Sequence, residues 1–165
     1  MIFPDSLSDE EFVTTFGGIY EHSDWVPRQV LGQRPFASIE SIRRALRQAV
    51  DEASEAEKLT LLMAHPDLAG KLARAGDLTE SSLREQVGLG LDRLSDAEFQ
   101  IFSAMNDHYR KTFGFPFIIC ARRTTKEGVL KAFQERVQNS RDDEIRIALA
   151  EVHQIASHRL DDLVA

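Results

Sequence analysis

The sequence has a single cysteine and none of the short motifs that most readily identify an enzyme class. Cys120 can form neither an internal disulfide nor a thiolate metal site, which favours a reducing compartment such as the cytoplasm. No HExxH, CxxC, GxGxxG or GxxxxGK[ST] pattern occurs, so metalloprotease, thiol-redox, dinucleotide-binding and P-loop functions lose their usual support. The carboxylates are scattered, and no His/Asp/Glu cluster has metal-ligand spacing. We therefore expect a site without metal or cofactor.

Basic charge is scarce, and no long apolar run occurs. Lys plus Arg number 20 against 27 Asp plus Glu, which gives a formal charge of −7. Nucleic-acid-binding domains normally carry a basic face, so no nucleic-acid partner is expected. No window approaches the roughly 18 apolar residues of a membrane span, and the acidic N-terminus is unlike a secretory signal. These features predict a soluble cytoplasmic protein with no membrane partner.

What is present suits an all-α fold in one domain, expected over residues 1–165. Apolar residues recur mostly at helical spacing, and several segments open with the Ser-x-x-Glu capping box. Helices are predicted over residues 8–16, 39–50, 54–64, 66–74, 95–113, 126–138 and 142–164, and one more begins at Thr79 or at Ser82. Residues 25–36, which contain two prolines, are expected to be irregular. The pattern predicts a helical bundle-like domain of about eight helices.

The stretch FGFPFIICA, residues 113–121, interrupts the helical pattern. It is aromatic, contains Gly114 and Pro116, and then becomes continuously apolar. No partner strand is evident, so we predict a buried irregular segment. Its peptide groups must find partners, either in the protein or in a flat polar ligand. Asn106 lies on the aromatic stripe of the preceding predicted helix and is expected to be a buried structural bridge.

Three further places are unusual for a plain helical bundle. His65 precedes Pro66, which disfavours the helical conformation at the histidine and so puts it at a joint between helices. A histidine there can exchange a proton near neutral pH, or it can be an ordinary surface or capping residue. Ser82, Glu85 and Gln86 form either a local capping box or a polar group in which Glu85 orients His65 and Gln86 binds an amide edge.

Arg159 is the third unusual place. It lies seven positions after Val152 and therefore points with the apolar stripe of the last predicted helix. A buried charge is costly unless it is paired. Arg159 is therefore expected to pair with an internal carboxylate, to reach an anionic ligand, or to extend to solvent from near the helix end.

Six stretches together resemble one family, the 2-oxo-4-hydroxy-4-carboxy-5-ureidoimidazoline (OHCU) decarboxylases. They are AHPDLAGKLA (64–73), LTESSLREQ (78–86), GLDRLSDAEF (90–99), MNDHYRKTFGFPFIICAR (105–122), ERVQN (135–139) and ALAEVHQIASHRLDDL (148–163). They occur in the order and spacing of the family and span essentially the whole chain. The first and fourth stretches are the most specific.

The resemblance implies an all-α homodimer that converts OHCU to (S)-allantoin and CO2 in urate degradation. It implies that His65 is the catalytic histidine and that Arg159 corresponds to an arginine near the end of the family's last helix. The implied substrate contacts are Pro66, Ser82, Leu83, Arg84, Glu85, Gln86 and the backbone of Phe117, Ile118, Ile119, Cys120 and Ala121. The expected partner is thus a small ureidoimidazoline substrate.

We hypothesise that His65 is the acid/base at the reacting carbon and that Glu85 fixes its tautomer. Two other functions stay open. The first is a non-catalytic helical interaction module, which would show no turnover. The second is a lyase or hydrolase acting on a related ureide, which would keep His65 and Glu85 in a different ring pocket.

Overall fold

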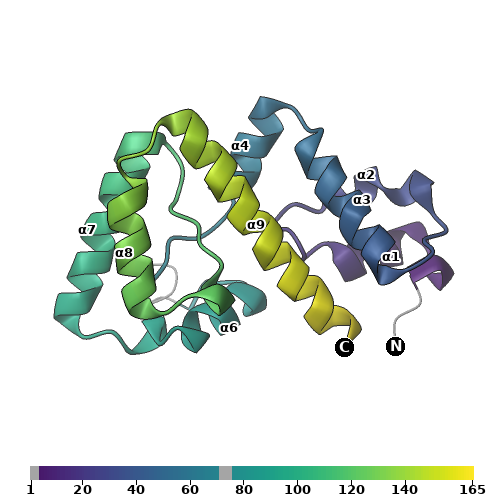
Figure 1. The fold of residues 1–165 in the computed structure, drawn as a ribbon. Coiled ribbons are helices and arrows are strands. Elements are labelled where there is room, and N and C mark those ends of the chain that lie inside the picture. The colour runs from purple at the N-terminus through teal and green to yellow at the C-terminus, as the bar shows by residue number, and fades with distance from the viewer. Residues whose placement is uncertain (1–3, 71–75) are drawn as a thin grey trace. The chain divides into compact units, whose positions relative to one another are not determined.

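The computed structural model describes residues 4–70 and 76–165, and within these residues it contains eight α-helices and no strand (Figure 1). The helices are α1 (Asp9–Phe16), α2 (Trp25–Gln29), α3 (Ile39–Asp51), α4 (Glu55–Met63), α6 (Glu80–Gly88), α7 (Asp96–Phe113), α8 (Lys126–Arg136) and α9 (Arg141–Val164). Short 3₁₀ turns are η1 (Pro4–Ser6), η2 (Leu31–Gln33), η3 (Leu91–Arg93) and η4 (Ala121–Arg123). The all-α prediction is confirmed. In the described part of the chain, no helix is long and apolar enough to cross a membrane.

Side-chain caps explain where several helices begin. At α1 the Ser8 hydroxyl accepts a hydrogen bond from the Glu11 N–H at 3.3 Å, and the Glu11 carboxylate accepts one from the Ser8 N–H at 2.8 Å. Ser54 and Ser95 form the same reciprocal box at α4 and α7. Each box satisfies backbone N–H groups that a helix start leaves without a partner.

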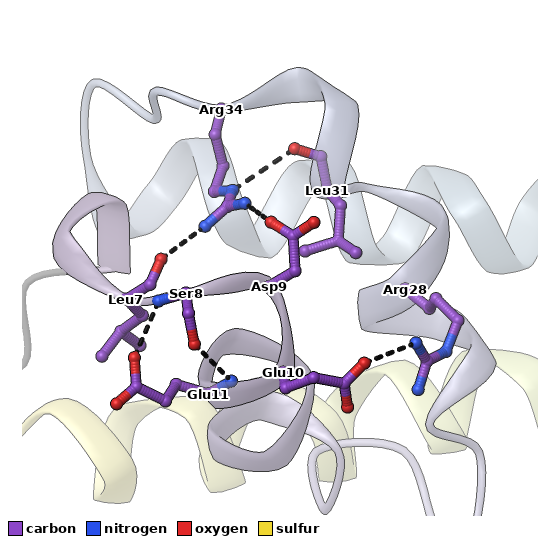
Figure 2. A network of polar contacts seen from close by, with 8 residues as sticks. All are labelled: Leu7, Ser8, Asp9, Glu10, Glu11, Arg28, Leu31 and Arg34. Atoms are coloured by element: carbon purple, nitrogen blue, oxygen red, sulfur yellow. Dashed lines mark hydrogen bonds and ion pairs between the residues drawn. The ribbon is translucent and has the colours of Figure 1, made fainter.

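A polar network anchors the start of α1 to a loop more than twenty residues away (Figure 2). Arg34 donates hydrogen bonds to the carbonyl oxygens of Leu7, at 2.8 Å, and of Leu31, at 3.3 Å, and it also forms an ion pair with Asp9. One arginine thus holds the entry to α1 against the end of η2.

Three local predictions were wrong or incomplete. Thr79, whose hydroxyl accepts from the Ser82 N–H at 3.2 Å, caps α6, so Ser82 lies inside the helix and its capping-box alternative is wrong. The short helix predicted over 66–74 does not begin at Pro66, since residues 66–70 are non-helical; residues 71–75 of that prediction lie outside the described residues. Helix α2 lies within the stretch predicted as irregular. The sequence did not reveal it, because five residues are too few to show a helical period and because a proline such as Pro27 is tolerated in the first turn of a helix.

The contacts divide the described chain into two compact units. Unit 1 combines the residues up to Ala64 with His153–Ala165, and unit 2 comprises the residues from His65 to Val152. The core of unit 1 includes the fully buried side chains of Phe12, Phe16, Ile42, Leu46 and Leu160. The expectation that all 165 residues form one domain stays a prediction.

Unit 2 is built around aromatic rings. Helices α7 and α8 lie side by side (Figure 1), with the ring centroids of Tyr109 and Phe133 6.1 Å apart. Phe117 packs edge-on against Tyr109 at 5.2 Å and lies 5.5 Å from Phe133. These rings bury the stretch after α7, which is neither helix nor strand from Gly114 to Cys120. The predicted buried irregular segment is confirmed.

Side chains supply partners for the backbone of this segment. Arg136 donates to the Ile118 carbonyl at 2.7 Å, and the Cys120 N–H donates to the Glu151 carboxylate at 2.8 Å. Arg136 is buried and forms an ion pair of 2.9 Å with Glu144, which also accepts a hydrogen bond of 2.5 Å from the Tyr109 hydroxyl. The segment is therefore held by a buried charged network, since no sheet is available to pair with it.

Candidate active site

His65 lies in the loop that follows α4, directly before Pro66, and is only 6% exposed. Helix α4 ends because the chain turns at Ala64, whose N–H still donates to the Thr60 carbonyl at 3.0 Å. The predicted non-helical joint at His65 is thus confirmed, and the alternative of a surface histidine is wrong. A buried imidazole in a loop has the setting in which a histidine acts on a bound molecule.

Polar side chains from α6 and α7 hold the loop after His65. The Gln86 side-chain oxygen accepts from the Ala69 N–H at 2.9 Å, and its Nε2 donates to the Asp67 carbonyl at 3.3 Å. Asn106 Nδ2 donates to the Leu68 carbonyl at 2.7 Å, which confirms it as a buried structural bridge. The loop is therefore fixed at three successive residues.

This bracing includes a pair that sequence reasoning missed. Arg110 of α7 donates to the Asp67 carboxylate at 3.0 Å. Ala69, at the end of the braced stretch, has a φ of +53°, a conformation uncommon outside glycine. The only sequence signal was the position of Asp67, two residues after the candidate histidine. The loop conformation thus depends on partners 17 to 43 positions further along the chain.

Helix α6 presents the predicted polar residues on one face. Ser82 and Gln86 are each 4% exposed and Glu85 is half-buried, as expected for positions i, i+3 and i+4 of a helix. Leu83 is 43% exposed, and Arg84 pairs with Glu80 at 3.1 Å in solvent. The structure therefore separates the predicted contacts into an inward group of three and an outward pair.

The inward face of α6 lies near the end of the irregular segment. Helix α6 contacts η4, which begins at Ala121. Burial raises the pKa of the Cys120 thiol, and the nearby carboxylates of Glu151 and Glu85 raise it further. The structure brings the α6 group and the residues around 120–121 together.

Only some peptide groups of the irregular segment after α7 are hydrogen-bonded within the protein. Among residues 4–70 and 76–165, the peptide N–H and C=O groups of Phe117 and Ile119 have no hydrogen-bond partner. Phe117 is 2% exposed and Ile119 is half-buried. Buried peptide groups normally find a partner, so these groups are suited to a polar ligand or to water.

A cavity of about 280 Å³ adjoins the braced loop within unit 2. Gln86, Leu83 and Ala69 line it together with Leu78, Val87, Leu91, Asp92, Leu94 and Phe99. Its walls are mostly apolar. No group of three His, Cys, Asp or Glu side chains suited to a metal ion occurs among the described residues.

Arg159 belongs to unit 1 and is 6% exposed. Its Nη1 lies 2.7 Å from the Glu21 carboxylate, and it also donates to the Gly18 carbonyl at 3.2 Å. Of the alternatives open at the sequence level, pairing with an internal carboxylate is the one observed, and extension to solvent is wrong. Glu21, which is 2% exposed, was missed because a glutamate in a polar stretch gives no signal of burial.

Comparison with known proteins identifies the family. The family model described as OHCU decarboxylase matches residues 5–161. A Haloferax volcanii protein named 2-oxo-4-hydroxy-4-carboxy-5-ureidoimidazoline decarboxylase is 41% identical over 154 residues, which cover 93% of this chain and 89% of that protein. A Xenopus laevis protein of the same name is 36% identical, with 96% of this chain and 91% of that protein covered.

Solved structures give the same result. A crystal structure of (S)-allantoin synthase aligns with a TM-score of 0.77 and 34% identity over 97% of this chain, which spans only 52% of that longer chain. A crystal structure of OHCU decarboxylase in the presence of (S)-allantoin aligns with a TM-score of 0.71 and 27% identity, with 95% of this chain and 98% of that chain covered. The resemblance in the sequence motifs is confirmed, and this chain belongs to the OHCU decarboxylase family.

Proposed function

We propose that the protein decarboxylates OHCU to (S)-allantoin and CO2 in the degradation of urate. The observation that carries this proposal is the 41% identity to a protein named for that activity, across most of both chains. The buried His65 loop, braced from α6 and α7, agrees with it, because a site for stereospecific chemistry needs rigid support.

The reaction makes modest demands on the protein. Loss of CO2 breaks a carbon–carbon bond and leaves its electron pair on the ring carbon. The adjacent ring carbonyl and imine can accept that pair, and a proton must then reach one face of the carbon. The enzyme has to hold the ring, release CO2 and control the proton.

His65 is the proposed source of that proton, with Glu85 as the residue that fixes its tautomer. Burial holds the imidazole in one place, and the half-buried Glu85 lies on the inward face of α6. A carboxylate that accepts from one ring nitrogen leaves the other nitrogen to act on the substrate. Pro66 would limit the movement of the histidine backbone.

Ser82 and Gln86 are the proposed contacts for the ureido or carboxylate edge. The Gln86 oxygen accepts from the Ala69 N–H, and one Nε2 hydrogen is directed to the Asp67 carbonyl. With respect to the described residues, the amide thus keeps one donor hydrogen and one lone pair of its oxygen for substrate. Gln86 therefore acts mainly by positioning the loop. Because Arg84 faces outward and pairs with Glu80, it enters the proposal through its backbone position in α6. The Leu83 side chain is 43% exposed and lines the cavity beside the braced loop.

The backbone of residues 117–121 is the proposed hydrogen-bonding partner of the ring amide of the substrate. The peptide groups of Phe117 and Ile119 offer both donors and acceptors, which is what a cyclic amide requires. Ile118 and Cys120 are already engaged by Arg136 and Glu151 and would keep the segment in place. The role proposed for Arg159 rests on the family resemblance: its guanidinium group would stabilise the oxyanion charge that develops on the substrate.

We further propose that the enzyme needs no cofactor, works in the cytoplasm and forms a homodimer. The reaction supports the first point, since the substrate's own carbonyl and imine act as the electron sink. The lone buried Cys120 supports a reducing compartment. Size-exclusion chromatography with light scattering tests the dimer, and a monomeric mass at assay concentration would contradict it.

The activity can be tested with OHCU made in the cuvette from urate by urate oxidase and hydroxyisourate hydrolase. OHCU decays unaided to racemic allantoin, so circular dichroism at an allantoin band separates the enzyme from the background. We expect a rapid circular-dichroism signal from one enantiomer of allantoin. The rate at which it forms should be about 10²–10⁴-fold lower in His65→Asn. A rate and a racemic product equal to buffer would overturn the proposal and leave an interaction module or an enzyme of a related ureide.

A further inference from the structure

Unit 1 contains a second cavity, of about 190 Å³, which the proposed reaction does not use. It lies between α3 and the part of α9 that belongs to unit 1. Its lining is Ile19, Tyr20, Glu40, Arg43, Arg44, Leu46, Arg47, His153, Gln154, Ala156, Ser157 and Leu160. The volume is below the roughly 300–1,000 Å³ typical of sites for drug-sized ligands, so a small molecule is the appropriate occupant.

Three arginines from α3 line this cavity, in a protein whose net charge is −7. Arg43 is fully engaged within the protein. It donates to Glu40 at 2.9 Å, to Asp161 at 2.6 Å and to Ser157, at 2.9 Å for the carbonyl and 2.6 Å for the hydroxyl. It therefore fastens α3 to α9 and also neutralises Glu40, the only acidic residue of the lining.

The other two arginines are available to a ligand. Arg44 is exposed and has no hydrogen bond or ion pair with any residue that the structure describes. Arg47 is 3.7 Å from Asp51, longer than a hydrogen bond, and the other oxygen of that carboxylate lies 2.8 Å from His153 Nε2. Among the described residues Arg44 thus has no carboxylate partner, and the contact of Arg47 with Asp51 is an ion pair without a hydrogen bond, so both guanidinium groups retain N–H donors for a ligand.

The inner wall of the cavity is rigid. The Tyr20 hydroxyl lies 2.8 Å from His153 Nδ1, and the opposite ring nitrogen lies 2.8 Å from Asp51. Tyr20 is 3% and His153 7% exposed, so both groups are buried and partnered. With a proton on Nε2, the histidine donates to Asp51 and accepts from Tyr20, which holds the phenol ring in one orientation. Ile19, Leu46, Ala156 and Leu160 form the apolar part of this wall, with side chains that are at most 5% exposed.

We propose that this cavity binds a small organic carboxylate, with the carboxylate group at Arg44 and Arg47 and the apolar body against Tyr20, Leu46 and Leu160. Guanidinium groups match the planar geometry of a carboxylate, and two of them can grip one anion. The apolar lining and the limited volume favour an aromatic or short aliphatic acid over a bare inorganic ion.

Isothermal titration with sodium benzoate as the probe, and with benzamide as its neutral counterpart of the same shape, tests this site. We expect benzoate to bind at least about tenfold more tightly than benzamide. The double variant Arg44→Gln/Arg47→Gln should weaken benzoate binding by about tenfold or more, because both charged donors are lost. The matched control is Arg93→Gln in unit 2, an exposed arginine that should leave the affinity unchanged.

His65→Asn separates this proposal from the proposed reaction. The variant should bind benzoate with wild-type affinity, since it alters unit 2 only, so either proposal can fail while the other stands. Equal binding of benzoate and benzamide, no binding of benzoate, or wild-type affinity in the double variant would each overturn the carboxylate site. If wild type does not bind benzoate and the double variant has a lower mass than wild type in light scattering, the carboxylate site is overturned. The arginines would then form a contact with a second copy of the chain.

Discussion

The side-chain oxygen of Gln86 accepts a hydrogen bond from the backbone N–H of Ala69 at 2.9 Å, so a residue of α6 fixes the loop that carries His65. The same amide donates to the Asp67 carbonyl at 3.3 Å. A residue expected to touch substrate therefore has a structural task in addition, and its substitution should affect both folding and catalysis.

Gln86→Met should lower the free energy of unfolding by about 2–3 kcal/mol, because the buried Ala69 N–H loses its acceptor. Urea unfolding measures this loss. Glu80→Gln on the exposed side of the same helix is the control and should cost less than about 0.5 kcal/mol. A loss for Gln86→Met no larger than that of the control would show that the brace is dispensable.

Glu85→Gln should lower kcat by about tenfold or more and leave KM nearly unchanged, if Glu85 acts through His65 rather than by gripping substrate. The decarboxylation assay by circular dichroism, run over a series of pH values, gives both constants. A selective rise in KM at constant kcat would instead assign Glu85 to substrate binding.

Arg159→Lys should lower the turnover by about tenfold, because an ammonium group cannot reproduce the planar guanidinium. Lysine can still pair with Glu21, so thermal unfolding should show a folded variant. Activity near wild type would show that planar geometry at this position is not required.

Glu144→Gln should be among the most destabilising single changes, with a loss of about 3–5 kcal/mol, since it leaves the buried Arg136 without its counter-charge. Asp143→Asn, which removes the exposed partner of Arg146, is the control and should cost less than about 1 kcal/mol. Chemical denaturation of both variants provides the comparison. Similar losses for the two variants would contradict a stabilising role for the buried network.

Stability should fall as the pH drops below about 6.5, in part through His153. Burial lowers the pKa of His153 in the folded protein, and this outweighs the hydrogen bond to Asp51, which raises it. At pH values between the pKa of His153 in the folded protein and its pKa in the unfolded chain, the unfolded chain binds more protons than the folded protein. Acid therefore favours unfolding in this pH range. Denaturation between pH 5 and 8 should therefore show a shallower pH dependence in His153→Asn than in wild type.

Asp51→Asn supplies the complementary test of the same residue. Removal of the carboxylate removes the influence that raises the pKa of His153, so the loss of stability should extend to lower pH than in wild type. An unchanged pH profile in both variants would show that His153 does not contribute.

Local chemistry in the sequence was sufficient for most helix boundaries and for the irregular segment. Ser8, Ser54 and Ser95 start helices because their caps involve residues only three positions away. Gly114, with a φ of +85°, ends α7 where the sequence predicted a break. The joint at His65 follows from Pro66, whose ring acts on the preceding residue. Each of these signals lies within a few residues of its effect.

Tertiary structure alone decided which partners the polar residues have. Nothing near Arg159 in sequence indicates Glu21, which lies 138 positions earlier, and nothing near Gln86 indicates the backbone of Asp67 and Ala69. Ser82 could be a cap or a helix-interior residue until Thr79 was seen to hold the cap. The reason is physical: capping and helical periodicity depend on neighbours along the chain, whereas a buried polar group is paired with whatever the packing of distant segments brings within hydrogen-bonding distance.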